Sequence, residues 1–126
     1  MTTIGIVLTI AAGAGFLLIG IAAIAQPAIL SHFYGLYVHE TNGRGFVRAT
    51  GARDAAFGAI LLIFAYRVPE AILVTLFAGV FLAIFDFLTV WRTNGRFEFP
   101  FLAGHIAGAI LLAGTAIIVG MSNLSR

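Results

Sequence analysis

The first long hydrophobic run of the chain, residues 4–25, reads IGIVLTIAAGAGFLLIGIAAIA, and Thr9 is its only clearly polar side chain. A transmembrane helix needs about 20 consecutive apolar residues, so this run is long enough to cross a bilayer. The competing interpretation is a signal peptide, because residues 23–25 (AIA) resemble a small-residue cleavage site. The run is long for such a peptide, however, and no lysine or arginine precedes it. We therefore predict a retained span.

The composition of the whole chain supports a membrane protein. Of its 126 residues, 61% are hydrophobic and 10% are charged, and its mean hydropathy is +1.08. An ordinary soluble domain is roughly 45–50% apolar and about 25% charged. The chain has room for about four membrane-spanning helices and little else, so we expect a single transmembrane domain over residues 1–126. It has no cysteine, which excludes disulfides and cysteine metal sites.

Polar breaks between the hydrophobic runs predict the order of the elements. The expected spans cover residues 4–25, 46–66, 71–91 and 99–121. Proline cannot continue a helical hydrogen-bond ladder, so Gln26-Pro27 should end the first span. Apolar residues at helical spacing over residues 27–39 predict a short interfacial helix, followed by a polar turn at residues 39–45. The predicted fold class is all-α: an integral membrane four-helix bundle with a short interfacial helix between spans one and two.

The basic residues are seven arginines, and they give the chain a calculated pI of 9.7. They are spread over loops and span ends, so we expect membrane lipid and no nucleic acid as partner. Four crossings place both termini on one side. The opposite side carries more arginine, with Arg44, Arg48, Arg92 and Arg96 against Arg67 and Arg126. Arginine excess marks the cytoplasmic side, so we expect the arginine loops in the cytoplasm and the termini outside. The expected location is the inner or plasma membrane of the cell.

Charged or titratable groups interrupt three of the hydrophobic runs: the Arg53-Asp54 pair, Asp86 and His105. Threading the runs through a bilayer brings these groups to a similar depth near one face. Ionisable side chains in hydrocarbon are costly and usually face the bundle interior in pairs. Adjacent helical residues point about 100° apart, so we expect Arg53 to pair with another span rather than simply with Asp54. A carboxylate is expected within reach of His105.

These groups are also the candidate functional residues. Asp54, Asp86 and His105 are the candidate catalytic residues, because a carboxylate and an imidazole in a dry cavity can exchange protons. Aromatic residues concentrate at the same end of the bundle, and an interfacial aromatic belt explains most of them. We expect Arg53, Phe57, Trp91 and Phe101 to contribute to binding a small lipophilic molecule.

Several alternatives stay open at this point. The sequence does not decide between binding and catalysis. The same polar residues suit a proton-coupled transporter subunit acting as a homo-oligomer, or a structural clamp between helices. A further alternative is a structural or accessory membrane subunit. His32 and His39 are seven residues apart and match no recognised ligand spacing, and His105 stands alone, so we expect no metal and no cofactor.

One segment carries a resemblance to a known family. Residues 51–58 read GARDAAFG, a Gly-x-Arg-Asp-x-x-x-Gly pattern, and are followed by Asp86 and by His105-Ile106-Ala107-Gly108. These features resemble a family of small four-span membrane proteins described only as a domain of unknown function. The resemblance covers about the last two thirds of the chain. It implies the fold class and supplies no activity.

Overall fold

The computed structural model describes residues 2–35, 41–94 and 99–124, and within these ranges it contains helices and no strand. Four helices are long: α1 (Thr3–Ala25), α3 (Thr41–Arg67), α4 (Ile72–Asn94) and α5 (Phe99–Leu124). Each contains a segment long and apolar enough to cross a membrane. The short helix α2 (Pro27–Phe33) follows α1, and the single turn η1 (Pro69–Ala71) precedes α4. The predicted all-α four-span bundle is confirmed.

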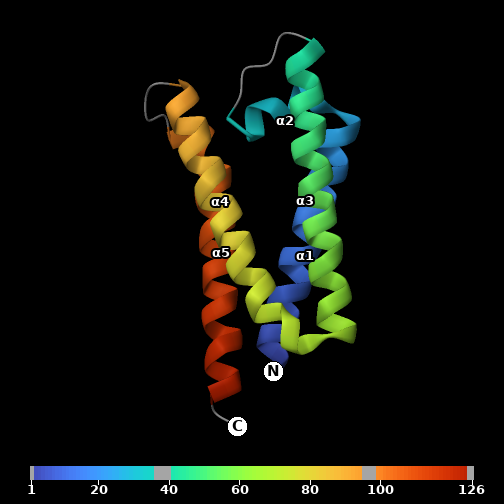
Figure 1. Cartoon of the computed structure of the whole chain (residues 1–126), viewed down its shortest axis with the longest axis vertical. Coiled ribbons are helices and arrows are strands. Elements are labelled where there is room, and N and C mark those ends of the chain that lie inside the picture. Colours follow the sequence, from blue (N-terminus) through green and yellow to red (C-terminus); the bar gives the residue numbers. More distant parts are fainter. Residues whose placement is uncertain (1, 36–40, 95–98, 125–126) are drawn as a thin grey trace.

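Local chemistry explains several of the helix ends. The Thr2 hydroxyl accepts a hydrogen bond from the Gly5 N–H at 3.3 Å, which caps the first turn of α1. Pro27 ends α1 as predicted and occupies the first turn of α2, where its missing N–H is harmless. Pro69 likewise occupies the first turn of η1. Figure 1 shows that α2 runs across one end of the bundle and that α1 begins and α5 ends at the opposite end.

The start of α3 differs from the sequence prediction. We expected a polar turn over residues 39–45, but α3 already begins at Thr41; residues 36–40, including the end of the predicted interfacial segment, lie outside the described ranges. Packing explains the longer helix, because Val47 in its second turn is 1% exposed and belongs to a cluster with Ala23 and Tyr34. Contacts with α1 and the end of α2 therefore stabilise turns that the local sequence does not favour.

The four long helices form two pairs, α1 with α3 and α4 with α5, and each pair packs together more extensively than with the other. Glycines make the first pair tight. A Cβ placed on Gly58 would lie 2.5 Å from the carbonyl oxygen of Gly13, and one placed on Gly51 would lie 2.6 Å from Cβ of Ala23. Such small-residue contacts let two backbones approach closely, which is how helices associate where no water drives them together.

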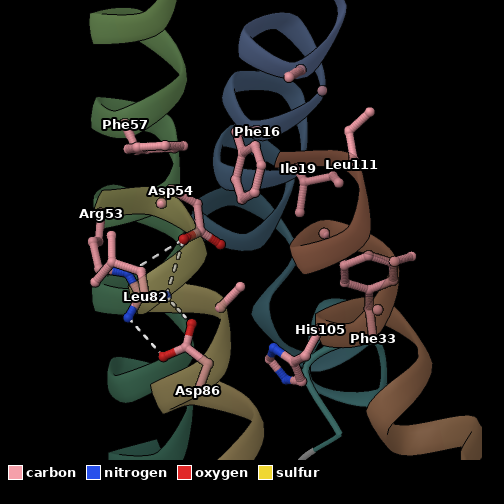
Figure 2. Close-up of a pocket in the computed structure, with 17 residues that line it drawn as sticks. Phe16, Ile19, Phe33, Arg53, Asp54, Phe57, Leu82, Asp86, His105 and Leu111 are labelled. Carbon is pink, nitrogen blue, oxygen red and sulfur yellow. Dashed lines mark hydrogen bonds and ion pairs between the residues drawn. The ribbon is translucent and has the colours of Figure 1, made fainter. Parts of the chain in front are cut away.

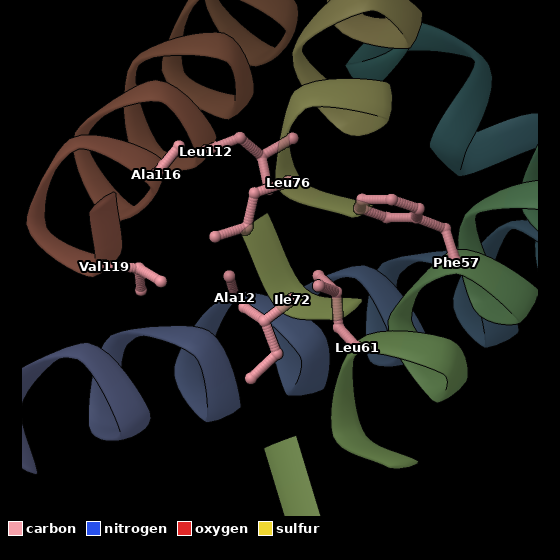
Figure 3. Packing of buried hydrophobic residues seen from close by; sticks show 8 residues of the cluster. All are labelled: Ala12, Phe57, Leu61, Ile72, Leu76, Leu112, Ala116 and Val119. Atoms are coloured by element: carbon pink, nitrogen blue, oxygen red, sulfur yellow. The ribbon is translucent and has the colours of Figure 1, made fainter. Parts of the chain in front are cut away.

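The two pairs converge toward the η1 end and separate toward the α2 end (Figure 1). The main apolar cluster is drawn from all four spans (Figure 3), and its members are Ala12, Phe57, Leu61, Ile72, Leu76, Leu112, Ala116 and Val119. Many other large apolar side chains face outward, including Leu18, Val74 and Ile110, which are 67%, 73% and 67% exposed. Surfaces of this kind suit lipid rather than water.

Candidate functional site

A cavity of about 260 Å³ lies between the two helix pairs and is lined by residues of α1, α2, α3, α4 and α5. Its walls are mostly apolar, with Phe16 from α1, Phe57 from α3 and Leu111 from α5 among them. The Phe16 and Phe57 rings meet edge to face, with their centroids 5.2 Å apart. An engineered apolar cavity of about 150 Å³ binds benzene, so this space is large enough for a small organic molecule.

Arg53 joins two carboxylates at one side of this cavity (Figure 2). Its Nη1 donates to Asp86 Oδ1 at 2.9 Å and its Nη2 donates to Asp86 Oδ2 at 2.6 Å. These two hydrogen bonds form a bidentate ion pair between α3 and α4. Nε and Nη2 also donate to Asp54 Oδ1, at 3.3 Å and 3.1 Å. The expectation that Arg53 pairs with another span is therefore confirmed by Asp86, and Arg53 also bonds to its own neighbour Asp54. The guanidinium extends far enough from the backbone to reach both carboxylates.

Tyr34, directly after α2, holds the other side of Asp54. Its hydroxyl donates to Asp54 Oδ2 at 2.7 Å, and the two residues are 5% and 7% exposed. Burial, and then the hydrogen bond to this carboxylate, raise the pKa of the Tyr34 hydroxyl well above its usual value. The hydroxyl therefore stays protonated and continues to donate. Asp54 thus receives hydrogen bonds from Arg53 and Tyr34 together.

His105 lines the cavity from α5 and is bonded to the backbone of the same tyrosine. Its Nε2 lies 3.1 Å from the carbonyl oxygen of Tyr34. A carbonyl can only accept, so Nε2 carries a hydrogen and Nδ1 of the neutral ring is an acceptor. Within the described residues no carboxylate lies within hydrogen-bonding distance of this ring, so the expected contact between His105 and an aspartate is not found.

Five of the seven predicted site residues line this cavity, and these are Arg53, Asp54, Phe57, Asp86 and His105. Trp91 does not line it. It lies more than one helical turn beyond Asp86 on α4, is 43% exposed, and its ring lies beside that of Phe87, with their centroids 6.2 Å apart. The side chain of Phe101 lies outside the described part of the structure.

Sequence reasoning missed three aromatic contributors to the site. Tyr34 falls in the predicted interfacial segment over residues 27–39, and Phe16 falls in the uncharged run over residues 4–25. Phe33 approaches α5 closely, because a Cβ placed on Gly104 would lie 3.3 Å from its Cζ. One signal was available for Tyr34, since a tyrosine on a buried helix face needs a partner for its hydroxyl. No local signal singles out Phe16 or Phe33.

The fold and the site define a class: a four-span helical membrane protein with an apolar cavity that has an arginine, two aspartates and a histidine on its wall. The model of the family described as Domain of unknown function (DUF4267) matches residues 13–119, so the chain belongs to this family. The match extends the resemblance seen in residues 51–108 into the first span. Comparisons with curated proteins and with solved structures gave no match.

Proposed function

We propose that this protein binds a small lipophilic molecule in the cavity between its two helix pairs. The observation that carries the proposal is the cavity itself, about 260 Å³ of space with apolar walls and with Arg53, Asp54, Asp86 and His105 on its lining. Pockets for small molecules combine apolar walls with a few convergent polar groups in this way.

Glycines on the cavity wall support the proposal. A Cβ placed on Gly15 would meet no atom within 4 Å, and one placed on Gly108 would meet only Cζ of Phe16, at 3.8 Å. A methyl group would therefore fit at both positions without a clash. Protein interiors are normally close-packed, and an unfilled void costs stability roughly in proportion to its volume. A ligand that occupies the space would offset this cost.

The geometry favours binding over acid–base catalysis as the primary role. Both carboxylates are already bonded by Arg53, and Asp54 also by Tyr34. A general base must be within reach of the proton that it takes, whereas these carboxylates are held in a network between helices. We retain the plasma membrane as the proposed location, with the termini outside and the arginine loops in the cytoplasm, because of the arginine distribution.

Filling the cavity tests the proposal. Gly15→Leu places a side chain into the space, whereas Gly114→Leu adds the same side chain at a position on α5 that also has no atom within 4 Å of a Cβ and does not line the cavity. Both proteins are purified in mild detergent and analysed by untargeted mass spectrometry of small molecules. We expect a reproducible co-purifying molecule in the wild-type and Gly114→Leu proteins and at least a tenfold loss in Gly15→Leu.

Thermal unfolding provides the folding control for this comparison. Gly15→Leu should melt at or above the wild-type temperature after extensive delipidation, because the leucine fills a void. A co-purifying molecule that is equally abundant in both variants would place its binding outside the cavity. No co-purifying molecule in several detergents would contradict the proposal and leave the polar residues as a clamp between α3 and α4.

A further inference from the structure

The polar groups on the cavity wall supply more acceptors than donors. Every nitrogen of Arg53 that can donate, Nε, Nη1 and Nη2, already donates to Asp54 or Asp86. Four of its five N–H groups are used in this way and two carboxylates balance its charge, so the guanidinium is poorly placed to hold an incoming anion. Each oxygen of Asp86 receives one of these bonds, and a carboxylate oxygen has room for a second donor.

His105 adds a further acceptor on the same cavity. Its Nε2–H is directed to the carbonyl oxygen of Tyr34, which leaves Nδ1 as the acceptor of the neutral ring. Asp86 and His105 both line the cavity, from α4 and α5; in Figure 2 the Asp86 oxygens point toward Arg53 and the imidazole lies on the other side of Asp86. A ligand group placed between them would meet a carboxylate, which requires a donor, and a ring nitrogen, which accepts when the imidazole is neutral.

The net charge of the cluster formed by Arg53, Asp54 and Asp86 also favours a ligand group that donates hydrogen bonds. One guanidinium, that of Arg53, is matched by two carboxylates, Asp54 and Asp86. With both carboxylates ionised the cluster has one formal negative charge in excess. An uncompensated charge at membrane depth is costly, so a cation beside Asp86 would be stabilised there.

We propose that the cavity selects lipophilic amines: molecules with an apolar body, which lies among Phe16, Phe57 and Leu111, and a cationic N–H group, which lies toward Asp86 and His105. This inference rests on the proposed function and names its ligand class. It excludes fatty acids and other lipophilic carboxylates, because they would bring a second excess negative charge to a cluster whose arginine is already bonded.

Three probes with one hydrocarbon body test the selection: 3-phenylpropylamine, 3-phenylpropan-1-ol and 3-phenylpropanoate. At pH 7 they are cationic, neutral and anionic. Their binding to delipidated wild-type protein is measured by isothermal titration calorimetry in an uncharged detergent, with empty micelles as the blank. We expect affinities in the order amine, alcohol, carboxylate, with at least tenfold between the first and the last.

Two carboxamide variants identify the cause of the preference. Asp86→Asn keeps an oxygen that accepts from Arg53 and removes the excess charge, so it should reduce the ratio of amine to alcohol affinity at least fivefold. Glu70→Gln makes the same chemical change on an exposed residue of η1 and should leave the ratio unchanged. If Asp86→Asn does not fold, the order of the affinities of the three probes for wild-type protein still tests whether the cavity selects amines.

The outcomes separate this inference from the proposed function. Carboxylate affinity equal to or above that of the amine would overturn the selection for amines and leave ligand binding in place. Absence of binding by all three probes would also overturn it. The proposed function is then decided independently by the co-purification comparison of Gly15→Leu with Gly114→Leu.

Discussion

Arg53 is the residue through which α3 bonds to α4 near the cavity. The side chains of Arg53 and Asp86 are 37% and 25% exposed, so their ion pair is only partly desolvated. The ion pair is nevertheless bidentate, because the planar guanidinium matches the carboxylate in a geometry that lysine cannot reproduce. Asp54 is more buried and has a second donor in Tyr34. The two carboxylates therefore depend on Arg53 to different degrees.

Replacing Arg53 tests this difference. Arg53→Leu should lower the free energy of unfolding by more than the average of about 0.6 kcal/mol for polar contacts between membrane helices, because it leaves Asp54 and Asp86 without their cation. The loss should stay below about 3–5 kcal/mol, the loss for a fully buried pair, because Arg53 and Asp86 are partly exposed. Adding Asp86→Leu should recover more stability than adding Asp54→Leu. Asp86 loses both of its donors in the single variant, whereas Asp54 keeps the hydroxyl of Tyr34.

The measurement is unfolding of the single and double variants in mixed micelles. Greater recovery with Asp54→Leu would show that the neighbouring pair on α3 carries the coupling. If neither double variant were more stable than Arg53→Leu, the ion pairs would contribute nothing to folding, and Arg53 would serve the ligand or the lipid headgroups.

At the scale of the elements, the packing of α1 on α3 sets the position of one cavity wall. Gly13 and Gly20 of α1 face Gly58 and Gly51 of α3 in close contact. This contact brings the α1 residues Gly15, Phe16 and Ile19 and the α3 residues Arg53, Asp54 and Phe57 to the same cavity. On α4, Gly79 leaves room for the Phe57 ring, because a Cβ there would lie 3.0 Å from Cε1. Small residues thus determine where the large ones lie.

Gly58→Ala should therefore destabilise the bundle by about 1–3 kcal/mol, the usual cost of overpacking. The new methyl group would lie 2.5 Å from the carbonyl oxygen of Gly13, and backbone cannot move aside as a flexible side chain can. The matched control is Gly114→Ala in the middle of α5, where a Cβ meets no atom within 4 Å. Alanine is the better helix former, so the control should be neutral or up to about 1 kcal/mol more stable.

Thermal unfolding in one detergent compares the two variants. Equal stability of Gly58→Ala and wild-type protein would show that α1 and α3 can separate at little cost, and the close glycine contact would then not define the cavity wall.

At the scale of the whole molecule, two helix pairs converge at the η1 end and separate at the α2 end, where α2 closes the bundle (Figure 1). Tyr34 links the end of α2 to α3 through Asp54 and to α5 through His105. The cavity is thus a property of the complete four-span arrangement. The proposed orientation places the α2 end, with most of the arginines, in the cytoplasm.

Cysteine labelling tests that orientation, because the native chain has no cysteine. Asn94→Cys lies at the α2 end of the bundle, and Asn123→Cys lies at an exposed position near the end of α5. With a membrane-impermeant maleimide on intact cells, we expect Asn123→Cys to be labelled at once and Asn94→Cys only after permeabilisation. The unmodified protein controls for background, and the reverse pattern would invert the proposed orientation.

Much of the fold can be predicted from the hydropathy of the sequence. The bilayer acts as a uniform solvent across each span, so a long uncharged run such as residues 4–25 predicts a crossing without knowledge of its neighbours. The depth of Arg53, Asp54, Asp86 and His105 also follows from position along each helix, because the rise per residue is fixed. Class, number of spans and the shared level of the polar groups could therefore be predicted from the sequence.

The sequence does not predict how each helix is rotated about its axis or which side chains this rotation brings into contact. Only the tertiary structure shows these features. The link from Tyr34 to Asp54, the placement of Phe16 and Phe33 on the cavity wall and the outward position of Trp91 all depend on contacts between segments far apart in the chain. Lipid and protein interior are both apolar, so hydrophobicity does not tell a lipid-facing aromatic from one that lines a cavity. Close packing of glycines between α1 and α3 made that choice for Phe16 and Phe57.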